Sequence, residues 1–194
     1  MAPSAEIFSI NYSISHGDHG EHFEVRVKTA LHHEETTEHL MARFIAFALE
    51  YRDGLEFTLG LFDPDEPSMI ARNVIGETET WIDIGAVDPK KLRRSLASAP
   101  KAKHVVYFYQ ADDRDHFVHH LKGNRISRLD EVQFYQLDPQ FVGAMGHSLL
   151  RNSDLVVTSV DHTLYANFNG TAFESVFPEV DIIGALFTAR HFKD

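Results

Sequence analysis

Near both ends of the chain, hydrophobic and polar positions alternate with a period of two, which predicts β-strands. The alternation covers residues 6–13 and 22–31, and a polar segment with two glycines between them predicts a hairpin turn. It returns over residues 154–177 around Asn169-Gly170, a pair that is typical of tight turns between strands. The pattern therefore predicts an N-terminal hairpin and extra C-terminal strands around a central core.

In the middle of the chain, apolar residues recur every three or four positions, which predicts helices. The clearest helix has Met41, Phe44 and Ala48 on one stripe. Asp88 and Pro89 suit the start of another, because aspartate caps free N–H groups and proline fits the first turn. The helices expected from these signals cover residues 34–51, 88–99, 112–122 and 138–150.

Short apolar runs between the helices predict the strands of the core. The strands expected are 55–62, 78–86, 104–110 and 131–137. The run HVVYFYQ at 104–110 is apolar on both faces, which is typical of a central strand. In the run TETWIDIGA at 78–86, Trp81 and Asp83 fall on one face and two isoleucines fall on the other.

The order of these elements predicts an α/β fold in which helices flank a mixed sheet. The chain has 194 residues and 43% of them are hydrophobic, so we expect a single domain, 1–194, with its core at about 33–137. Because it has no cysteine, disulfides and thiolate chemistry are excluded. We see neither a signal peptide nor an apolar run of about 18 residues, so we expect a cytoplasmic protein without a membrane partner.

The formal net charge is −11, and a uniformly acidic surface would repel nucleic acid. The charge is uneven, however, because residues 90–128 hold ten Lys or Arg and three Asp. This segment could form a basic face that binds nucleic acid, or it could be the solvated surface of two helices.

Carboxylates fall on three neighbouring elements, as a Mg²⁺ or Mn²⁺ site for phosphodiester hydrolysis requires. Glu38 occupies the N-terminal end of the apolar stripe of the first helix, and Asp65 and Glu66 follow a strand in a proline-rich turn. Asp83 lies inside an otherwise apolar strand, where a half-buried carboxylate needs a partner or a metal ion. Helix capping, turn chemistry and an exposed strand edge would explain the same acids one by one.

Five distinctive segments follow one another between about residues 33 and 110. They are ETTEHLMARFIAFALEY, FTLGLFDPDEP, ARN at 71–73, WIDIGAVDPKKLRRS and HVVYFY. Together they resemble the YaeQ family, which is similar in fold to the PD-(D/E)XK, or restriction-endonuclease-like, nucleases. The resemblance implies such a core, with one acid on the first helix, one near a strand end, and (D/E)-X-K on the next strand.

The resemblance also assigns roles to positions of this chain. The matching acids are Glu38, or less favourably Glu35, on the helix, Asp65 or Glu66 after the strand, and Asp83 on the next strand. Gly85 stands where the lysine of the motif is expected. A cation from elsewhere would have to replace it, and the candidates are Lys90, Lys91 and Arg94 on the next helix and Arg72 on the connection before strand 78–86.

Two functions stay open at this point. The first is a metal-dependent nuclease in which these acids hold Mg²⁺ or Mn²⁺ and Lys90 or Lys91 supplies the missing cation. Its contacts to nucleic acid would come from Arg72, Lys90, Arg93 and Arg94. The alternative is a non-catalytic protein on a decayed nuclease fold that binds nucleic acid or protein, which Gly85 and the net charge of −11 favour.

Histidine is abundant, with 13 in the chain. A zinc site is conceivable among the histidines of the N-terminal hairpin and the connection after it, which are His16, His19, His22, His32 and His33. A polar turn explains them equally well. For His116, His119 and His120 we expect the solvated surface of a helix.

Overall fold

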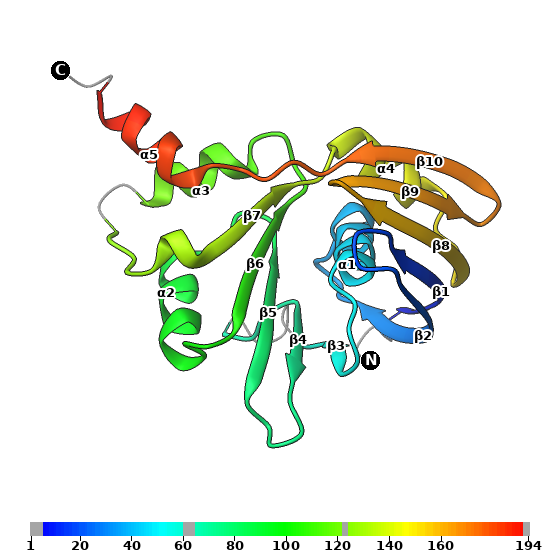
Figure 1. Cartoon of the computed structure of the whole chain (residues 1–194). Coiled ribbons are helices and arrows are strands. Elements are labelled where there is room, and N and C mark those ends of the chain that lie inside the picture. Colours follow the sequence, from blue (N-terminus) through cyan, green and yellow to red (C-terminus); the bar gives the residue numbers. More distant parts are fainter. Residues whose placement is uncertain (1–5, 60–64, 122–123, 192–194) are drawn as a thin grey trace. The chain divides into compact units, whose positions relative to one another are not determined.

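The computed structural model describes residues 6–59, 65–121 and 124–191. The chain divides into two compact units, each built from two separate stretches of sequence. Unit 1 comprises Met1–Arg52 and Leu137–Phe177, and unit 2 comprises Asp53–Gln136 and Pro178–Asp194. Each unit holds a five-stranded mixed sheet with helices against it (Figure 1).

In unit 1 the strand order is β10-β9-β8-β1-β2. The hairpin β1–β2 is antiparallel, β1 pairs with β8 in parallel, and β8, β9 and β10 form an antiparallel meander. The strands are β1 Glu6–His16, β2 Glu21–Leu31, β8 Asn152–Val160, β9 Thr163–Phe168 and β10 Thr171–Val176, and the helices are α1 Thr37–Leu49 and α4 Pro139–His147.

Helix α1 covers one face of this sheet and packs against α4. Alternate residues of β1 point into the interface, and Ile10, Tyr12 and Ile14 are buried there. The Tyr12 hydroxyl donates a hydrogen bond of 3.1 Å to the carbonyl oxygen of Phe44. Because Thr36 caps the start of α1 through the N–H of His39, the chain turns sharply between β2 and the helix.

In unit 2 the strand order is β3-β4-β5-β6-β7, with β3, β4 and β5 antiparallel and β5, β6 and β7 parallel. The strands are β3 Leu55–Phe57, β4 Met69–Arg72, β5 Thr78–Ile84, β6 Lys103–Phe108 and β7 Val132–Gln136. The helices are α2 Pro89–Ser98, α3 Asp113–Leu121 and α5 Ile182–His191, with the 3₁₀ turn η1 Leu129–Glu131. Helix α2 makes the crossover from β5 to the parallel strand β6 (Figure 1).

Helices α2, α3 and α5 all contribute to one apolar core on a face of the unit 2 sheet. This core includes Leu92 of α2, Phe117 of α3, Phe108 of β6, Phe134 of β7 and Ile182 of α5. Because paired residues of parallel strands point to the same side, Asp83, which pairs with the core residue Val106, lies on this helix-covered face.

The helices and most of the strands predicted from the sequence are present. The turn at Asn169-Gly170 joins β9 to β10, and β6 is an interior strand, as expected. The prediction of one sheet is wrong: β1 pairs with β2 on one side and β8 on the other, so the hairpin and the C-terminal strands form a sheet of their own. The mixed α/β fold with flanking helices is confirmed, whereas a single domain with a core at 33–137 stays a prediction.

Strand β4, helix α5 and the 3₁₀ turn η1 were not predicted. Strand β4 has only four residues, too few for an alternating pattern, so Arg72 ends a strand and does not lie on a connection. Helix α5 follows the last predicted strand. The predicted strand 55–62 is shorter in the structure, which assigns Leu55–Phe57 to β3 and does not describe residues 60–64. Within the described part of the chain, no helix has the length and apolar character needed to span a bilayer.

Candidate active site on β5 and α2

Asp83, near the end of β5, is the most unusual charged residue of unit 2. It is only 2% exposed. Its Oδ2 accepts a hydrogen bond of 2.9 Å from the indole N–H of Trp81, and its Oδ1 lies 2.8 Å from Nζ of Lys91. Among the described residues, no donor meets Oδ1 in hydrogen-bond geometry, so Lys91 compensates it through charge alone. A buried carboxylate with this little support keeps the capacity to bind another ligand.

Gly85 shows why no lysine follows Asp83 at the motif position. Its φ angle is +81°, in the left-handed region that favours glycine. A Cβ atom here would lie 3.3 Å from Cε1 of Tyr109, and the Gly85 N–H is held by the carbonyl oxygen of Tyr107. The backbone that ends β5 and leads into α2 therefore disfavours any side chain at residue 85.

Helix α2 brings two cations to the acids of unit 2. Lys91 pairs with Asp83, and Arg94, three residues later on the same helix face, pairs with Asp65 at 2.5 Å. Side chains three apart on a helix lie about 5–6 Å from each other at Cβ, so the two acids approach neighbouring positions of α2. The pairs differ in environment, because both partners of the Arg94 pair are about 63% exposed.

The loop before β4 lies beside the end of β5. The Ser68 N–H donates to the carbonyl oxygen of Ile82 at 2.9 Å, which sets Asp65 and Glu66 only a few residues from this junction. Glu66 accepts a hydrogen bond of 3.3 Å from the backbone N–H of Leu59. The antiparallel pairing of β4 with β5 thus brings Asp65, Glu66 and Asp83 to the same end of the two strands. Their ligand atoms do not all lie within 4.8 Å of one another, so the three acids do not converge as a metal site in this arrangement.

His104 of β6 belongs to the same region, although no sequence pattern pointed to it. It pairs with Trp81 across the strands and is 2% exposed. Its Nε2 lies 3.0 Å from the carbonyl oxygen of Ala99, so Nε2 carries the proton, and among the described residues its buried Nδ1 has no hydrogen-bond partner. Burial lowers the pKa of His104, although the hydrogen bond to Ala99 and the charge of Asp83 oppose that effect.

In unit 1 the two glutamates at the start of α1 differ in burial, in the opposite sense to the prediction. The side chain of Glu38 is exposed, so its predicted place on the apolar face is wrong. The side chain of Glu35 is fully covered and accepts bonds from His39 Nδ1 at 2.7 Å and Arg43 Nη1 at 3.0 Å. Because Thr36 is the helix cap, Glu35 precedes the helix and folds back toward Arg43. The carboxylate oxygens of Glu35 are thus already engaged by hydrogen bonds within the protein, whereas a metal-binding role for Glu38 stays a prediction.

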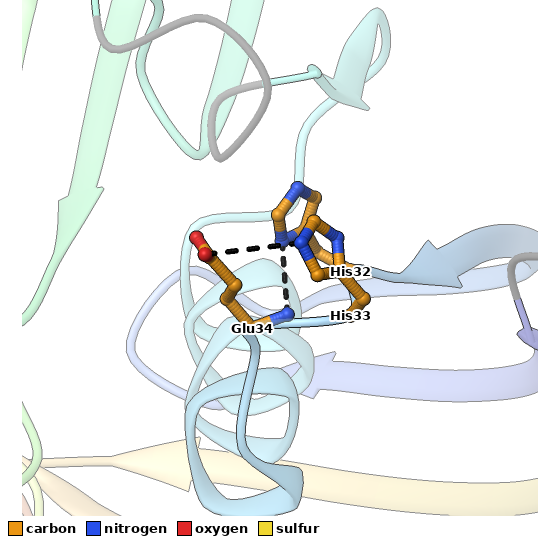
Figure 2. Close-up of side chains that lie close together, drawn as sticks. All are labelled: His32, His33 and Glu34. Atoms are coloured by element: carbon orange, nitrogen blue, oxygen red, sulfur yellow. Dashed lines mark hydrogen bonds and ion pairs between the residues drawn. The ribbon is translucent and has the colours of Figure 1, made fainter. Parts of the chain in front are cut away.

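Three residues of the same connection, His32, His33 and Glu34, hold ligand atoms within 4.8 Å of one another. Figure 2 shows that Nδ1 of His32 faces the backbone N–H of Glu34, from which it accepts a hydrogen bond of 3.1 Å. The neutral ring therefore carries its proton on Nε2, which leaves neither nitrogen as a metal ligand in this arrangement. The cluster is accounted for by the turn into α1.

Of the other predicted histidines, His16 and His22 have protein partners and His19 is exposed. His16 Nε2 bonds the carbonyl oxygen of Ala48, and His22 contacts Ser15 and Glu24. Among the described residues, His32, His33 and Glu34 form the one grouping with metal-ligand spacing, so the hairpin histidines do not converge. On α3, His116 lies beside Asp112 at 3.5 Å with both side chains exposed, as expected for a solvated helix surface.

The basic segment 90–128 divides into exposed and engaged cations. Lys90 and Arg93 of α2 are exposed. Arg128 is engaged by Glu131 and by the carbonyl oxygens of Leu96 and Pro100. Arg114 pairs with Asp115, and Arg72 of β4 pairs with Glu56 at 3.2 Å. Helix α2 therefore carries exposed positive charge near Asp65 and Asp83, and Lys101, Lys103 and Arg125 are exposed elsewhere in the segment.

These features define a mixed α/β protein with a buried aspartate–lysine pair between a strand end and the following helix. The chain belongs to the YaeQ family, whose profile, described as YaeQ protein, matches residues 1–176. Helix α5 lies beyond the matched range.

Individual relatives agree with this assignment. The YaeQ protein of Escherichia coli strain K12 is 30% identical over 108 residues, which are 55% of this chain and 59% of that protein. The YaeQ protein of Salmonella typhi is 28% identical over 99 residues, 51% of this chain and 55% of that protein. The matched region thus spans little more than half of the length of these relatives.

Two solved structures are similar over nearly the whole chain. The crystal structure of the YaeQ protein from Xanthomonas axonopodis pv. citri has a TM-score of 0.81 at 26% identity and covers 91% of this chain and 98% of that chain. The YaeQ protein from Pseudomonas syringae has a TM-score of 0.79 at 19% identity, with coverage of 93% and 98%. Both likenesses support the mixed α/β fold.

Proposed function

We propose that this chain is a metal-dependent nuclease of the PD-(D/E)XK type in which Lys91 takes the role of the lysine that is absent at Gly85. The observation that carries the proposal is the ion pair of 2.8 Å between Lys91 and the buried Asp83. A cation reaches the strand-end carboxylate from the next helix because the backbone at Gly85 disfavours a side chain.

The topology of unit 2 supports this proposal. Three antiparallel strands, β3, β4 and β5, are followed by a helical crossover to the parallel strand β6. This order agrees with the two strand acids that the family resemblance implies, one before β4 and one on β5. The acid implied for the first helix, Glu38, belongs to α1 of unit 1. The pairing of β4 with β5 gathers both acids at one end of the sheet.

The donor set suits a hard divalent ion. Asp83 Oδ1, together with Asp65 or Glu66, would hold Mg²⁺ or Mn²⁺, which prefer carboxylate oxygen and water. When bound, such an ion activates a water molecule and offsets charge on the phosphoryl group. Trp81 orients Asp83, Lys91 stabilises charge developing on the phosphate, and Lys90, Arg93 and Arg94 contact the phosphate backbone.

Cleavage assays test the proposal. Purified full-length protein is incubated with single- and double-stranded DNA and RNA in Mg²⁺, Mn²⁺ or EDTA. We expect metal-dependent cleavage that Asp83→Asn lowers about 10³-fold, because loss of a metal ion removes several kcal/mol of transition-state stabilisation. Glu174→Gln, prepared in the same way, should keep full activity, since Glu174 is an exposed residue of β10. Equal cleavage by the wild type and Asp83→Asn would mean a contaminating nuclease and would reject the proposal.

A second function has one specific observation in its favour. Lys91 and Arg94 neutralise Asp83 and Asp65, as cations that replace a lost metal ion would. Together with the net charge of −11, this suits a non-catalytic binding or regulatory protein on a decayed nuclease core. Nucleic-acid binding that needs α2 cations but proceeds without cleavage in Mn²⁺ would select this alternative.

A further inference from the structure

Helix α2 carries its positive charge at the end where a helix least favours it. Lys90 and Lys91 lie in the first turn, directly after the cap Asp88, and that turn contains no acidic residue. The N–H groups of a helix N-terminus bear partial positive charge, which repels a cation placed there. Cations in the first turn of α2 go against the preference of the helix. Because they lie beside a buried carboxylate, they indicate a binding site in which another contact compensates for this cost.

The compensating contact is incomplete. Trp81 holds Oδ2 of Asp83 with a well-formed hydrogen bond, but Lys91 meets Oδ1 only as an ion pair, without hydrogen-bond geometry among the described residues. A divalent ion held by Asp83 would need Oδ1, the oxygen that the ammonium group of Lys91 now contacts at 2.8 Å. Two positive charges at the same oxygen would repel each other.

We infer that Lys91 and a divalent metal ion compete for Oδ1 of Asp83, so that Lys91 acts as a built-in counter-ion that must leave before the metal binds. The inference rests on the proposed function, in which Asp83 is a metal ligand. It adds that, in the metal-free protein, the positive charge of Lys91 blocks Asp83 Oδ1 from binding a metal ion. Metal affinity is therefore set by the strength of the Lys91 contact as well as by the acids.

Lys91 has room to leave. Its side chain is 18% exposed, and four methylene groups let the ammonium group swing from a buried oxygen to solvent. The outer pair between Arg94 and Asp65 opens more easily, because both side chains are largely exposed and water replaces the contact. Released from Asp83, the ammonium group of Lys91 becomes free to bind a substrate phosphate.

Titration of the full-length protein with Mn²⁺ alone, followed by calorimetry, tests the competition. Lys91→Gln keeps a donor near Oδ1 and removes the charge, and Lys91→Met removes both. We expect each variant that folds to bind Mn²⁺ about tenfold more tightly than the wild type, a typical coupling between two ligands of one site. Lys28→Gln, which removes an exposed positive charge from β2, should leave the Mn²⁺ affinity within about twofold.

A thermal unfolding series in EDTA and in Mn²⁺ provides the second readout. Because Lys91→Met leaves Asp83 uncompensated, Mn²⁺ should raise its melting temperature more than that of the wild type. Equal or weaker Mn²⁺ binding by both Lys91 variants, or no binding by any protein, would overturn the competition.

The competition and the nuclease proposal fail in different ways. Tighter Mn²⁺ binding by Lys91→Gln without any cleavage by the wild type would support the competition and reject catalysis. Metal-dependent cleavage by the wild type, with Mn²⁺ affinity unchanged in both Lys91 variants, would keep the nuclease and reject the competition.

Discussion

Two buried carboxylates of this protein, Glu35 before α1 in unit 1 and Asp83 near the end of β5 in unit 2, are compensated in opposite ways. In unit 1, Glu35 accepts bonds from His39, from Arg43 and from the backbone N–H of His32. In unit 2, Asp83 accepts one hydrogen bond from Trp81 and otherwise has only the charge of Lys91. The first arrangement is complete, whereas the second leaves oxygen lone pairs for a ligand.

The surroundings of the two carboxylates explain this difference. Burial alone would raise the pKa of Glu35, but the hydrogen bond from His39 and the charge of Arg43 outweigh it and hold the pKa below its usual range. Glu35 is therefore a charged residue whose hydrogen bonds link the end of β2, the turn and α1. Asp83 has a rigid orienting partner on one oxygen and a flexible cation on the other, the arrangement expected where a ligand exchanges.

The largest expected effect is a difference in the free energy of unfolding between variants of the two carboxylates. Glu35→Gln removes a charge partner of the buried Arg43, so we expect the free energy of unfolding to fall by about 3 kcal/mol. Asp83→Asn keeps an acceptor for Trp81 and frees Lys91 to reach solvent, so its change should stay within about 1 kcal/mol. Urea unfolding of both variants in EDTA measures the difference. Similar losses in the two variants would remove the distinction between a structural and a ligand-binding carboxylate.

Trp81 provides the next test, because it orients Asp83 without contacting a ligand itself. Trp81→Phe removes the indole N–H and keeps an aromatic ring on the same face of β5. We expect Mn²⁺ affinity to fall about tenfold, the lower end of losses for partners that orient a metal ligand. Phe117→Leu, in the core of the same unit, is the control for general loosening. An equal loss of affinity in the control would show that Trp81 acts only through packing.

Substitutions at Gly85 should not restore the lysine of the (D/E)-X-K motif in a functional form. Gly85→Ala places a Cβ atom at φ +81° and 3.3 Å from the Tyr109 ring, so we expect a loss of about 1–2 kcal/mol in stability. Gly85→Lys should lose at least as much and gain no cleavage activity. Gly143→Ala on α4 meets no atom within 4 Å and should stabilise by about 0.5–1 kcal/mol. Higher activity of Gly85→Lys would show that the motif position still accepts a lysine.

The smallest expected effect is a pH dependence that differs between the units. The pKa of His104 is lowered by burial, so the unfolded chain takes up its proton first, and this contribution to stability is lost as pH falls below about 6.5. The lowered pKa of Glu35 makes its contribution disappear only below about pH 4.3. Urea unfolding at pH 7.5, 5.5 and 3.5 measures how the free energy of unfolding changes with pH. We expect a smaller change than in the wild type between pH 7.5 and 5.5 for His104→Gln, and between pH 5.5 and 3.5 for Glu35→Gln. A wild-type slope in both variants would assign the acid sensitivity to other groups.

Local patterns predicted much of unit 2. Alternation placed Trp81 and Asp83 on one face of β5, and Asp88-Pro89 marked the start of α2 that carries Lys91. Which cation approaches Asp83 was open, because a sequence does not fix how far a helix rotates over a sheet.

Other parts lay beyond such patterns for physical reasons. The helical pattern of apolar residues favoured Glu38. Because α1 begins only after Thr36, Glu35 is not part of the helix, and its side chain folds back to pair with Arg43. The parallel pairing of β1 with β8 joins residues about 140 positions apart, which periodicity does not encode. His104 had no signal, because a histidine at the start of an apolar strand is indistinguishable from a core residue.

Calorimetric titration with Mn²⁺ at pH 7.5 tests the central claim most directly, which is that the incompletely compensated carboxylate is the ligand-binding one. The wild type, Asp83→Asn and Glu35→Gln are compared under conditions in which all three are folded. We predict one Mn²⁺ site in the wild type and in Glu35→Gln, and loss of that site in Asp83→Asn. Binding by Asp83→Asn that equals the wild type would contradict the account.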